Sequence, residues 1–454
     1  MQTNFTELME SVATIAPGEF QTITEYPATE RQSVEWAVFA ATSNRSNNLS
    51  VTGLMEQVDV EASEKAFQAL VHRHESLRTT YKFRDGNVIQ VVHPAACCKL
   101  VMDYTDLSRV PDPERKLGEL KEKVLNISFD LVNGPVYQVS LVKIAGQKYL
   151  YGFVIDHIAA DSLSIEILKS EFQNLYVAYA SGNPAPVLNP LIFQMKDYAL
   201  WEQETNNGHV GKNNLAYWLK QLQAPLPVFG VKVPVNGNAL PLIFKSGKCM
   251  FFISNDMIGV NQAQFANPSI FITAALNLWL SWLTQNNSVI FGMPVSTRES
   301  DKLTKVVGYM IAALYLKIDY TDDQTFLDLY ELVVEKYSEA LAHRHYPRKG
   351  LPADIDNYCT AMLKVNLDMF KHTAYTGKPF AHEYISNIPY YPLDCEIAVF
   401  KNGFTLSLHY NNFLFFNKDV TDLFKKFPML IKAVMEHSGQ SLLSLKNGLS
   451  GGLV

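Results

Sequence analysis

Residues 155–164, with the sequence IDHIAADSLS, join an apolar run to an amphipathic segment. The preceding residues 149–155 are typical of a buried strand, and residues 164–178 repeat apolar side chains at helical spacing. This pattern places His157 in the loop between a strand and a helix, with Asp161 four residues further along. Because such loops often carry functional residues, we take this segment as the candidate site.

The two titratable residues of this loop permit two interpretations. His157 can act as a general base, since an unperturbed imidazole has a pKa of about 6.5. Asp161 can hold the loop or cap the following helix. In the second interpretation Asp161 is only an N-cap, and His157 is a partly buried turn residue. Both interpretations stay open at this point, because HxxxD is a short pattern.

Length and composition limit the class of protein. The chain has 454 residues, which is enough for two or three domains. Its 48% hydrophobic and 19% charged residues exclude a disordered chain. The formal net charge is −6 and no long run of Lys and Arg occurs, so we do not expect a nucleic-acid partner bound mainly through phosphates. The most apolar stretch, residues 272–283, is shorter than the ~20 residues of a membrane helix, so we expect a buried helix and no membrane partner.

Several kinds of chemistry have no motif in this sequence. The five cysteines form no CxxC pair, and the acidic N-terminal residues do not resemble a secretory signal, so we predict a cytoplasmic protein. The patterns HExxH, GxGxxG after a strand and GxxxxGKS/T are absent, and GxSxG occurs once, at residues 448–452. Consequently we predict no metal site and no nucleotide chemistry.

Helices and strands alternate through both halves of the chain. In the first half we expect a helix over residues 63–79 and a hairpin over residues 81–92. Residues 181–190, SGNPAPVLNP, interrupt the pattern with Pro and Gly. We therefore predict an α/β (α+β two-layer) fold with an N-terminal lobe of residues 1–180, which carries HxxxD, and a C-terminal lobe of residues 181–454. In the C-terminal lobe we expect helices over residues 272–283 and 420–434 and strands over residues 289–293, 313–318 and 404–410.

Longer motifs along the chain support a more specific hypothesis. They are, in order, RHESLRTTY at residues 73–81, DYALW at 197–201, YW at 217–218, FGMPVSTR at 291–298, GYM at 308–310 and SN at 386–387. Together they resemble the motifs of condensation domains of nonribosomal peptide synthetases, which belong to the chloramphenicol acetyltransferase-like superfamily of HxxxD acyltransferases. The resemblance covers most of the chain, from about residue 26 to about residue 435.

The resemblance implies a fold and a role for the candidate site. The implied fold has two chloramphenicol acetyltransferase-like lobes that form a V with a central tunnel. The family motif HHxxxDG corresponds to DHIAADS at residues 156–162, which keeps the second His and the Asp. It implies that His157 orients or deprotonates an acceptor amine or hydroxyl as the acceptor attacks a thioester carbonyl. It also implies that Asp161 points away from substrate and forms a structural ion pair with Arg298.

This chain departs from the family motif at two positions. Asp156 replaces the first His, and Ser162 replaces the Gly. Asp156, Asp161 and Ser164 spell DxxxxDxxS, which resembles the motif of heterocyclization domains that condense and then cyclise Cys, Ser or Thr, so cyclisation is an alternative function. Asp156 is a further catalytic candidate, as a carboxylate that raises the basicity of a nearby His, or it is a solvated turn residue. We expect Arg298, Ser162 and Ser164 to support the site.

The family also implies the partners. Its members have no built-in cofactor and receive an acyl or peptidyl thioester on the phosphopantetheine arm of a carrier protein, which we expect here in trans, for nonribosomal peptide or related natural-product biosynthesis. The acceptor is a small-molecule amine or hydroxyl. Candidate contacts to carrier or acceptor are Tyr309, Asn387 and Arg348, the last in the basic run of residues 343–349. That run can meet a phosphate or an acidic helix, or it is an ordinary solvated surface. A third hypothesis is a catalytically silent module that recruits a carrier protein.

Overall fold

The computed structural model describes most of the chain as two compact units. The first comprises the described parts of Met1–Val210 and Ser296–Ile311, and the second those of Gly211–Val295, Ala312–Gly377 and Ile388–Val454. The described residues are 22–41, 47–100, 102–125, 127–223, 225–227, 246–254, 265, 267–352, 355, 361–366, 393–400, 403–411 and 417–451.

The larger sheet of the first unit carries the strand that leads to His157. Its strand order is β2-β7-β6-β5, with β7 antiparallel to both neighbours and β5 parallel to β6. The strand expected from the sequence at residues 149–155 is β7. The strands are β2 (Asn48–Glu56), β5 (Met102–Asp106), β6 (Tyr137–Ala145) and β7 (Lys148–Asp156).

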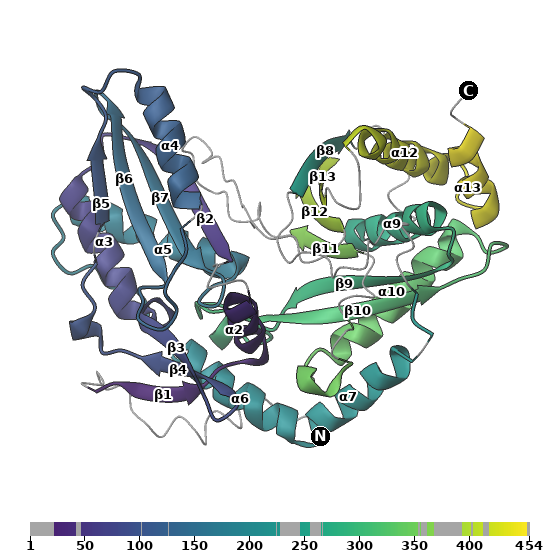
Figure 1. The fold of residues 1–454 in the computed structure, drawn as a ribbon, viewed down its shortest axis with the longest axis horizontal. Coiled ribbons are helices and arrows are strands. Elements are labelled where there is room, and N and C mark those ends of the chain that lie inside the picture. Colours follow the sequence, from purple (N-terminus) through teal and green to yellow (C-terminus); the bar gives the residue numbers. More distant parts are fainter. Residues whose placement is uncertain are drawn as a thin grey trace. The chain divides into compact units, whose positions relative to one another are not determined.

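Helices cover both faces of this sheet (Figure 1). Helices α3 (Val60–Arg73) and α5 (Ser162–Ala180) pack on one face, where the ring of Phe67 stacks on Phe153 at 6.0 Å and on Phe172 at 4.3 Å. On the other face, α4 (Pro113–Leu125) packs apolar side chains against β6 and β7. Because both faces are covered, every residue of β7 after its first is buried.

The helix expected over residues 63–79 is shorter in the structure. Helix α3 ends at Arg73 because His74 takes an extended backbone conformation, with φ −102° and ψ 110°. A short helix, η1 (Glu75–Arg78), and strand β3 (Thr79–Arg84) follow it. Strand β3 pairs antiparallel with β4 (Asn87–Val92), which confirms the hairpin expected over residues 81–92.

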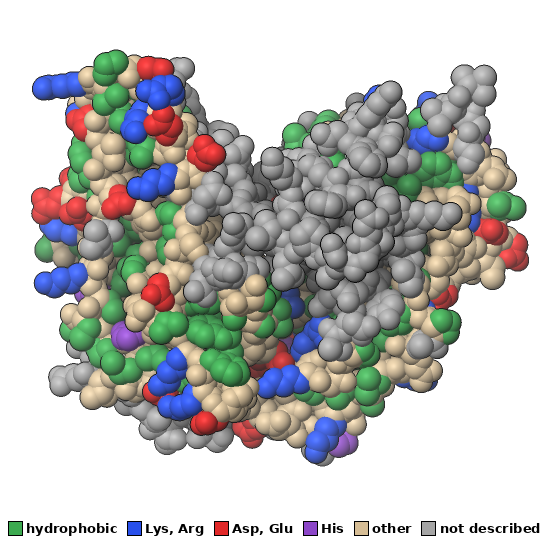
Figure 2. Space-filling model, viewed as in Figure 1, with side chains coloured by type: hydrophobic (Ala, Val, Ile, Leu, Met, Phe, Trp, Pro, Cys, Tyr) green, Lys and Arg blue, Asp and Glu red, His purple; other side chains and the backbone are tan. Residues whose placement is uncertain are grey.

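A second, three-stranded sheet completes the first unit. Its order is β1-β4-β3, with β1 at Thr24–Pro27. Helix α2 (Glu30–Ala41) follows β1. Helix α6 (Met195–Asn207) packs against β1. A short helix η2 (Ala95–Cys97) follows β4. On the face shown in Figure 2, the Lys and Arg side chains of this unit are interspersed with Asp and Glu.

The first unit extends beyond the boundary predicted after residue 180. Helix α6 and the segment Ser296–Ile311 also belong to it. Helix α6 and this segment belong to the first unit because their apolar side chains form one buried cluster. Its members are Phe193, Met195, Tyr198, Trp201, Leu303, Val306 and Met310. A loop rich in Pro and Gly is therefore not the boundary of the unit.

The second unit is built on a six-stranded sheet with the order β10-β9-β11-β12-β13-β8. The expected strands at residues 289–293, 313–318 and 404–410 lie within β9, β10 and β13. Strand β11 is parallel to β9 and β12, whereas β12, β13 and β8 pair antiparallel. The strands are β8 (Ser246–Ser254), β9 (Ser288–Ser296), β10 (Ile311–Asp319), β11 (Ala361–Asn366), β12 (Leu393–Phe400) and β13 (Gly403–Asn411).

Helices pack around this second sheet to form the largest core of the protein. Helix α9 contains the apolar stretch 272–283, and side chains such as Trp279 are fully buried, so the expected buried helix is confirmed. None of the helices in the described part of the chain has the length and hydropathy that a membrane span needs. The helices of this unit are α7 (His209–Gln221), α9 (Pro268–Thr284), α10 (Phe326–Ala342), η4 (Arg348–Gly350), α12 (Asn417–Glu436) and α13 (Leu442–Gly451). The short helix η3 (Asp301–Leu303) lies in the segment assigned to the first unit.

Candidate functional site

The loop between β7 and α5 is held by hydrogen bonds on both sides of His157. The backbone N–H of His157 donates to the carbonyl of Asn47 at 2.7 Å. The N–H of Ile158 donates to a carboxylate oxygen of Asp156 at 2.9 Å, and the N–H of Ala159 donates to the Asp156 carbonyl at 3.0 Å. His157 itself is partly exposed, whereas its neighbours in the loop are buried. The loop therefore presents one imidazole on a fixed backbone.

Asp156 is a turn residue, but it is not solvated as the sequence allowed. Its carboxylate bonds the backbone two residues further on, which is the geometry of an Asx turn. Only 2% of the residue is exposed. The Asp that replaces the first His of the family motif thus helps to shape the loop that carries His157.

Asp161 and Arg298 form the ion pair that the motif resemblance implied. The guanidinium donates to the two carboxylate oxygens at 2.6 Å and 3.0 Å, and each side chain is 1% exposed. Burial alone would raise the pKa of Asp161, but the charge of Arg298 and the bonds from Arg298 and Ser164 outweigh burial and lower it. Asp161 also caps helix α5, since it accepts from the Ser164 N–H at 2.8 Å. Asp161 therefore holds the loop and also caps α5, so it is not only an N-cap.

The two serines expected to support the site behave differently. The Ser164 hydroxyl lies 2.7 Å from the Asp161 carboxylate and accepts from Arg298 at 3.0 Å. It also accepts from the Gly308 N–H at 3.0 Å. Ser162, by contrast, is exposed on the first turn of α5. Ser164 belongs to the buried support of the loop, and Ser162 lies outside it.

The ion pair also fixes the backbone of residues 306–310. Arg298 donates to the carbonyls of Val306 and Gly308 at 3.0 Å and 3.2 Å. The other member of the ion pair, Asp161, accepts from the Met310 N–H at 3.1 Å. A side chain at position 308 would overlap Met195, whose sulfur would lie 2.2 Å from the added Cβ, so the segment needs Gly there.

This backbone support places Tyr309 against His157. The two rings lie 4.3 Å apart between centroids and are tilted by 36°. The guanidinium carbon of Arg31 lies 5.6 Å from the centre of the Tyr309 ring, and Arg31 donates to the Tyr309 hydroxyl at 3.4 Å. Tyr309, which the sequence suggested as a contact to carrier or acceptor, is buried and packs on the candidate catalytic ring.

The RHESLRTTY motif forms a buried polar brace in the first unit. Arg73 donates to both oxygens of Glu171 at 2.9 Å and 3.2 Å, and His74 Nε2 lies 2.7 Å from the same carboxylate. Burial lowers the pKa of His74 despite this carboxylate, so we assign a neutral ring that donates from Nε2. The next residue, Glu75, bonds Lys196 of α6 at 2.6 Å. These pairs join the end of α3 to α5 and α6.

Two functional candidates were missed by the sequence-based expectations. Gln32 of α2 and Tyr81 of β3 both donate to the carbonyl of Ile158, next to His157. Tyr81 is the last residue of the RHESLRTTY motif. The motif was recognised in the sequence, but no role was assigned to Tyr81. For Gln32, the signal was a helix-start pattern in which Gln follows Thr29 by three residues.

The basic run of residues 343–349 is ordered against α7 in the second unit. The ring of His343 stacks on Tyr217 at 3.9 Å, and Asn214 donates to the His345 carbonyl at 2.6 Å. The Arg348 guanidinium lies 5.7 Å from the centre of the Tyr315 ring. The run is therefore partly packed rather than fully solvated. The remaining candidate contact, Asn387, lies outside the described residues.

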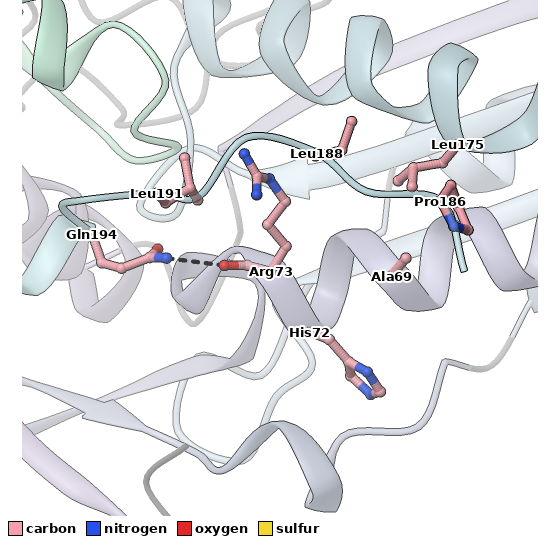
Figure 3. Close-up of a pocket in the computed structure, with 8 residues that line it drawn as sticks. All are labelled: Ala69, His72, Arg73, Leu175, Pro186, Leu188, Leu191 and Gln194. Atoms are coloured by element: carbon pink, nitrogen blue, oxygen red, sulfur yellow. Dashed lines mark hydrogen bonds between the residues drawn. The ribbon is translucent and has the colours of Figure 1, made fainter. Parts of the chain in front are cut away.

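A groove of about 450 Å³ lies on the first unit, but the His157 loop does not line it. Figure 3 shows it between α3 and the segment that follows α5, with Gln194 bonded to the Arg73 carbonyl at 2.9 Å. It is lined by Ala69, His72, Arg73, Leu175, Pro186, Leu188, Leu191 and Gln194. The groove and the candidate site are therefore separate features.

Comparison with curated proteins finds multidomain synthetases. The chain is 26% identical over 439 residues to a linear gramicidin synthase of Brevibacillus parabrevis, and the match covers 92% of this chain and 8% of that protein. It is 29% identical over 311 residues to a plipastatin synthase of Bacillus subtilis (strain 168), and this match covers 67% of this chain and 8% of that protein. The chain thus spans only a small part of the relatives it matches.

Comparison with solved structures confirms the fold class. The starter condensation domain of rhizomide synthetase matches with a TM-score of 0.77 at 16% identity, covering 92% of this chain and 98% of that one. The X-domain from teicoplanin biosynthesis matches with a TM-score of 0.78 at 21% identity, covering 92% and 96%. Both likenesses establish a mixed α/β fold of the condensation type for this chain.

The family assignment rests on the length of one further match. The model described as "Condensation domain" matches residues 22–447, a stretch that covers most of both units and every motif quoted from the sequence. The expected family is confirmed, and the expected acyltransferase class is that of the family. This chain belongs to the condensation domain family of nonribosomal peptide synthetases.

Proposed function

We propose that this chain joins an acyl or peptidyl thioester, carried on the phosphopantetheine arm of a carrier protein, to an amine acceptor. The product belongs to nonribosomal peptide or related natural-product biosynthesis. One observation carries the proposal: a partly exposed His157 lies on a loop whose backbone is bonded on both sides. An imidazole held in this way is suited to meet the proton of an attacking nucleophile.

The reaction balances with His157 as the proton carrier. The acceptor nitrogen attacks the thioester carbonyl, a C–N bond forms, and the C–S bond breaks. His157 accepts a proton from the nitrogen and returns it to the leaving thiolate. Holding both reactants near the ring supplies up to ~7–11 kcal/mol of the barrier in favourable cases. Proton transfer by a positioned base typically adds a factor of ~10² to 10⁴ in rate.

The carboxylates of the loop favour condensation over cyclisation. Asp161 is bonded to Arg298, Ser164 and the backbone of Met310, so we assign it to the support of the loop. Asp156 directs one oxygen to the Ile158 N–H. Both acids are at most 2% exposed, which supports structural roles rather than contact with a substrate. If cyclisation nevertheless occurs, Asp156→Ala should remove the ring-forming step alone.

For the carrier protein, we propose contact with the basic run of residues 343–349. The run holds Arg344, Arg348 and Lys349, which suit the phosphate of the arm or an acidic carrier helix. Its backbone is bonded to α7, so little ordering is needed on docking. Delivery of the donor in trans remains part of this proposal.

The proposed transfer can be tested by intact-mass analysis of acyl-loaded carrier proteins incubated with the enzyme and a library of amines. We expect loss of the acyl group from the carrier and a matching amide product. His157→Ala should lower the rate by ~10²- to 10⁴-fold. The matched control is His72→Ala, which removes an exposed histidine of α3 outside the loop and should leave the rate unchanged.

Two other outcomes would contradict the proposal. Full transfer by a correctly folded His157→Ala protein would show that His157 is not the base. If the wild-type protein turned over no thioester but bound carrier protein with the same affinity as His157→Ala, the chain would be a recruitment module instead.

A further inference from the structure

The carbonyl of Ile158 has two buried side-chain donors. The Tyr81 hydroxyl donates to it at 3.2 Å, and the Gln32 side-chain nitrogen donates at 3.3 Å. Gln32 is fully buried and Tyr81 is 1% exposed. The two donors also contact each other, since the Gln32 nitrogen lies 3.1 Å from the Tyr81 oxygen. The peptide between Ile158 and Ala159 is therefore anchored inside the first unit.

The start of α2 fixes the direction of the Gln32 amide. Its side-chain oxygen accepts from the Thr29 N–H at 2.9 Å, while the Gln32 N–H donates to the Thr29 hydroxyl at 3.2 Å. This reciprocal cap turns the amide nitrogen away from Thr29 and toward Ile158. The same nitrogen lies 3.4 Å from Gln90, which itself bonds the Pro27 carbonyl at 2.8 Å.

Tyr81 reaches the loop from a different element. It lies on β3, and its backbone N–H donates to the carbonyl of Leu131 at 2.7 Å. Burial is the main cause that raises the pKa of its hydroxyl, and the charge of Asp156 adds to it. The hydroxyl consequently keeps its proton and remains a donor. Helix α2 and strand β3 thus meet at one acceptor in the loop.

We propose that Tyr81 and Gln32 are positioning residues that orient His157 through the Ile158 carbonyl. The inference rests on the proposed function, because it assigns a task to His157. Asn47 and Asp156 accept from the backbone N–H groups of His157 and Ile158. Releasing the Ile158 carbonyl removes its two side-chain donors, so the loop can rotate and displace the imidazole. A displacement of about 1 Å at a reacting group can cost ~10²-fold in rate.

Because both donors share one acceptor, their effects are not additive. Either donor alone still satisfies the buried carbonyl, whereas removing both leaves it without a side-chain donor. Tyr81→Phe preserves shape and removes one donor, and Gln32→Met removes the other donor together with the oxygen that accepts from the Thr29 N–H. We expect a small loss of kcat in each single variant and a loss of ~10²-fold in the double variant, with KM nearly unchanged.

The experiment combines kinetics with NMR spectra of the histidine rings. The kinetic probes are the acyl-loaded carrier protein and the amine that the wild-type protein turns over in the intact-mass experiment. The ring signals of His157, assigned with His157→Ala, should shift or broaden in Tyr81→Phe and more strongly in the double variant. The matched control is Tyr149→Phe, which removes a hydroxyl from the same core cluster at the far end of β7 and should leave these signals unchanged.

The outcomes separate this inference from the proposed function. An unchanged His157 signal together with wild-type kcat in a folded double variant would overturn the positioning role. If the double variant does not fold, an unchanged signal in Tyr81→Phe overturns it as well. A fully active His157→Ala would contradict the proposed function alone, because the ring signals would still report whether Tyr81 and Gln32 orient the imidazole.

Discussion

Ser162 and Ser164 stand two residues apart at the start of α5, but only one of them takes part in the buried support of the loop. Ser164 is fully buried and its hydroxyl accepts from Arg298 and Gly308 while lying 2.7 Å from Asp161. Ser162 is exposed. At the scale of the residue, burial and hydrogen bonding decide the effect of a mutation far more than position in a motif.

This contrast predicts different costs for two identical substitutions. Ser164→Ala should lower the free energy of unfolding by ~1–3 kcal/mol, because it leaves buried donors of Arg298 and Gly308 without this acceptor. Ser162→Ala should change it by less than ~0.5 kcal/mol. Chemical denaturation measures both values. Equal losses in the two variants would show that the Ser164 hydroxyl contributes no more than an exposed one.

The sequence predicted some residues of the site and missed others for a definable reason. His157, Asp161 and Arg298 belong to motifs with fixed spacing, so their resemblance could be recognised and the ion pair expected. The ring of Tyr309 on His157, and the bonds from Gln32 and Tyr81 to Ile158, depend on which elements meet in space. Contacts of that kind leave no pattern in a single chain.

At the scale of the element, Gly308 lets the segment 296–311 pass close to α6. A Cβ at that position would lie 2.2 Å from the sulfur of Met195 and 2.8 Å from its Cγ. Met195 is itself 1% exposed, so its side chain has little room to move. This close approach to α6 helps to place the backbone of residues 306–310 where it bonds Asp161 and Ser164.

Gly308→Ala should therefore lower the free energy of unfolding by ~1–3 kcal/mol through overpacking. The cost should shrink in a Met195→Ala background, where the clash is absent, so a double-mutant cycle should give a favourable coupling energy. Gly118→Ala is the control, because Gly118 lies in α4 with no atom near its missing Cβ and should be neutral or stabilising. Purely additive costs for Gly308 and Met195 would refute the steric explanation.

At the scale of the whole molecule, buried ionisable groups couple stability to pH. Burial lowers the pKa of His74, with a smaller contribution from Arg73, although Glu171 acts to raise it. In the unfolded chain the ring takes up a proton near pH ~6.5. Below that pH the unfolded state binds more protons, so the contribution of His74 to stability is full above pH ~6.5 and falls as the pH drops.

Glu202 acts in the opposite direction. Burial raises the pKa of its carboxyl to about 7, although the Glu30 N–H donates to it at 2.8 Å. Its contribution is therefore complete at low pH and is lost as the pH rises through about 7. Because the two groups oppose each other, the pH slope of the wild-type protein alone does not isolate either of them.

The prediction is consequently a difference between two proteins. Between pH 7.5 and pH 5.5, wild type should lose more free energy of unfolding than His74→Gln, by up to ~1.4 kcal/mol per pH unit. Denaturant titrations of both proteins at the two pH values measure this difference. Parallel losses would mean that His74 takes up its proton equally in the folded and unfolded states.

The division into two parts was foreseen, whereas the path of the chain between them was not. Residues 181–190 look like a linker because Pro and Gly interrupt the helical pattern. In the structure the chain continues in the first unit through α6 to Val210 and returns to it at Ser296. The signal for this return is the buried cluster of Met195, Trp201, Val306 and Met310, whose members lie about a hundred residues apart in sequence. A local pattern does not reveal such a long-range cluster.

The return of the chain at Ser296–Ile311 has a consequence for protein engineering. A chimera that exchanges residues 1–210 as one block would combine the His157 loop of one parent with Arg298, Gly308 and Tyr309 of the other. The exchangeable module is instead discontinuous, and a recombination scheme that respects it transfers the two stretches together. If the parents differ in either stretch and only one stretch is exchanged, the hybrid would combine Asp161 and Ser164 of one parent with Arg298 and Gly308 of the other. The contacts that support the His157 loop would then be mismatched, however well the crossover points are joined.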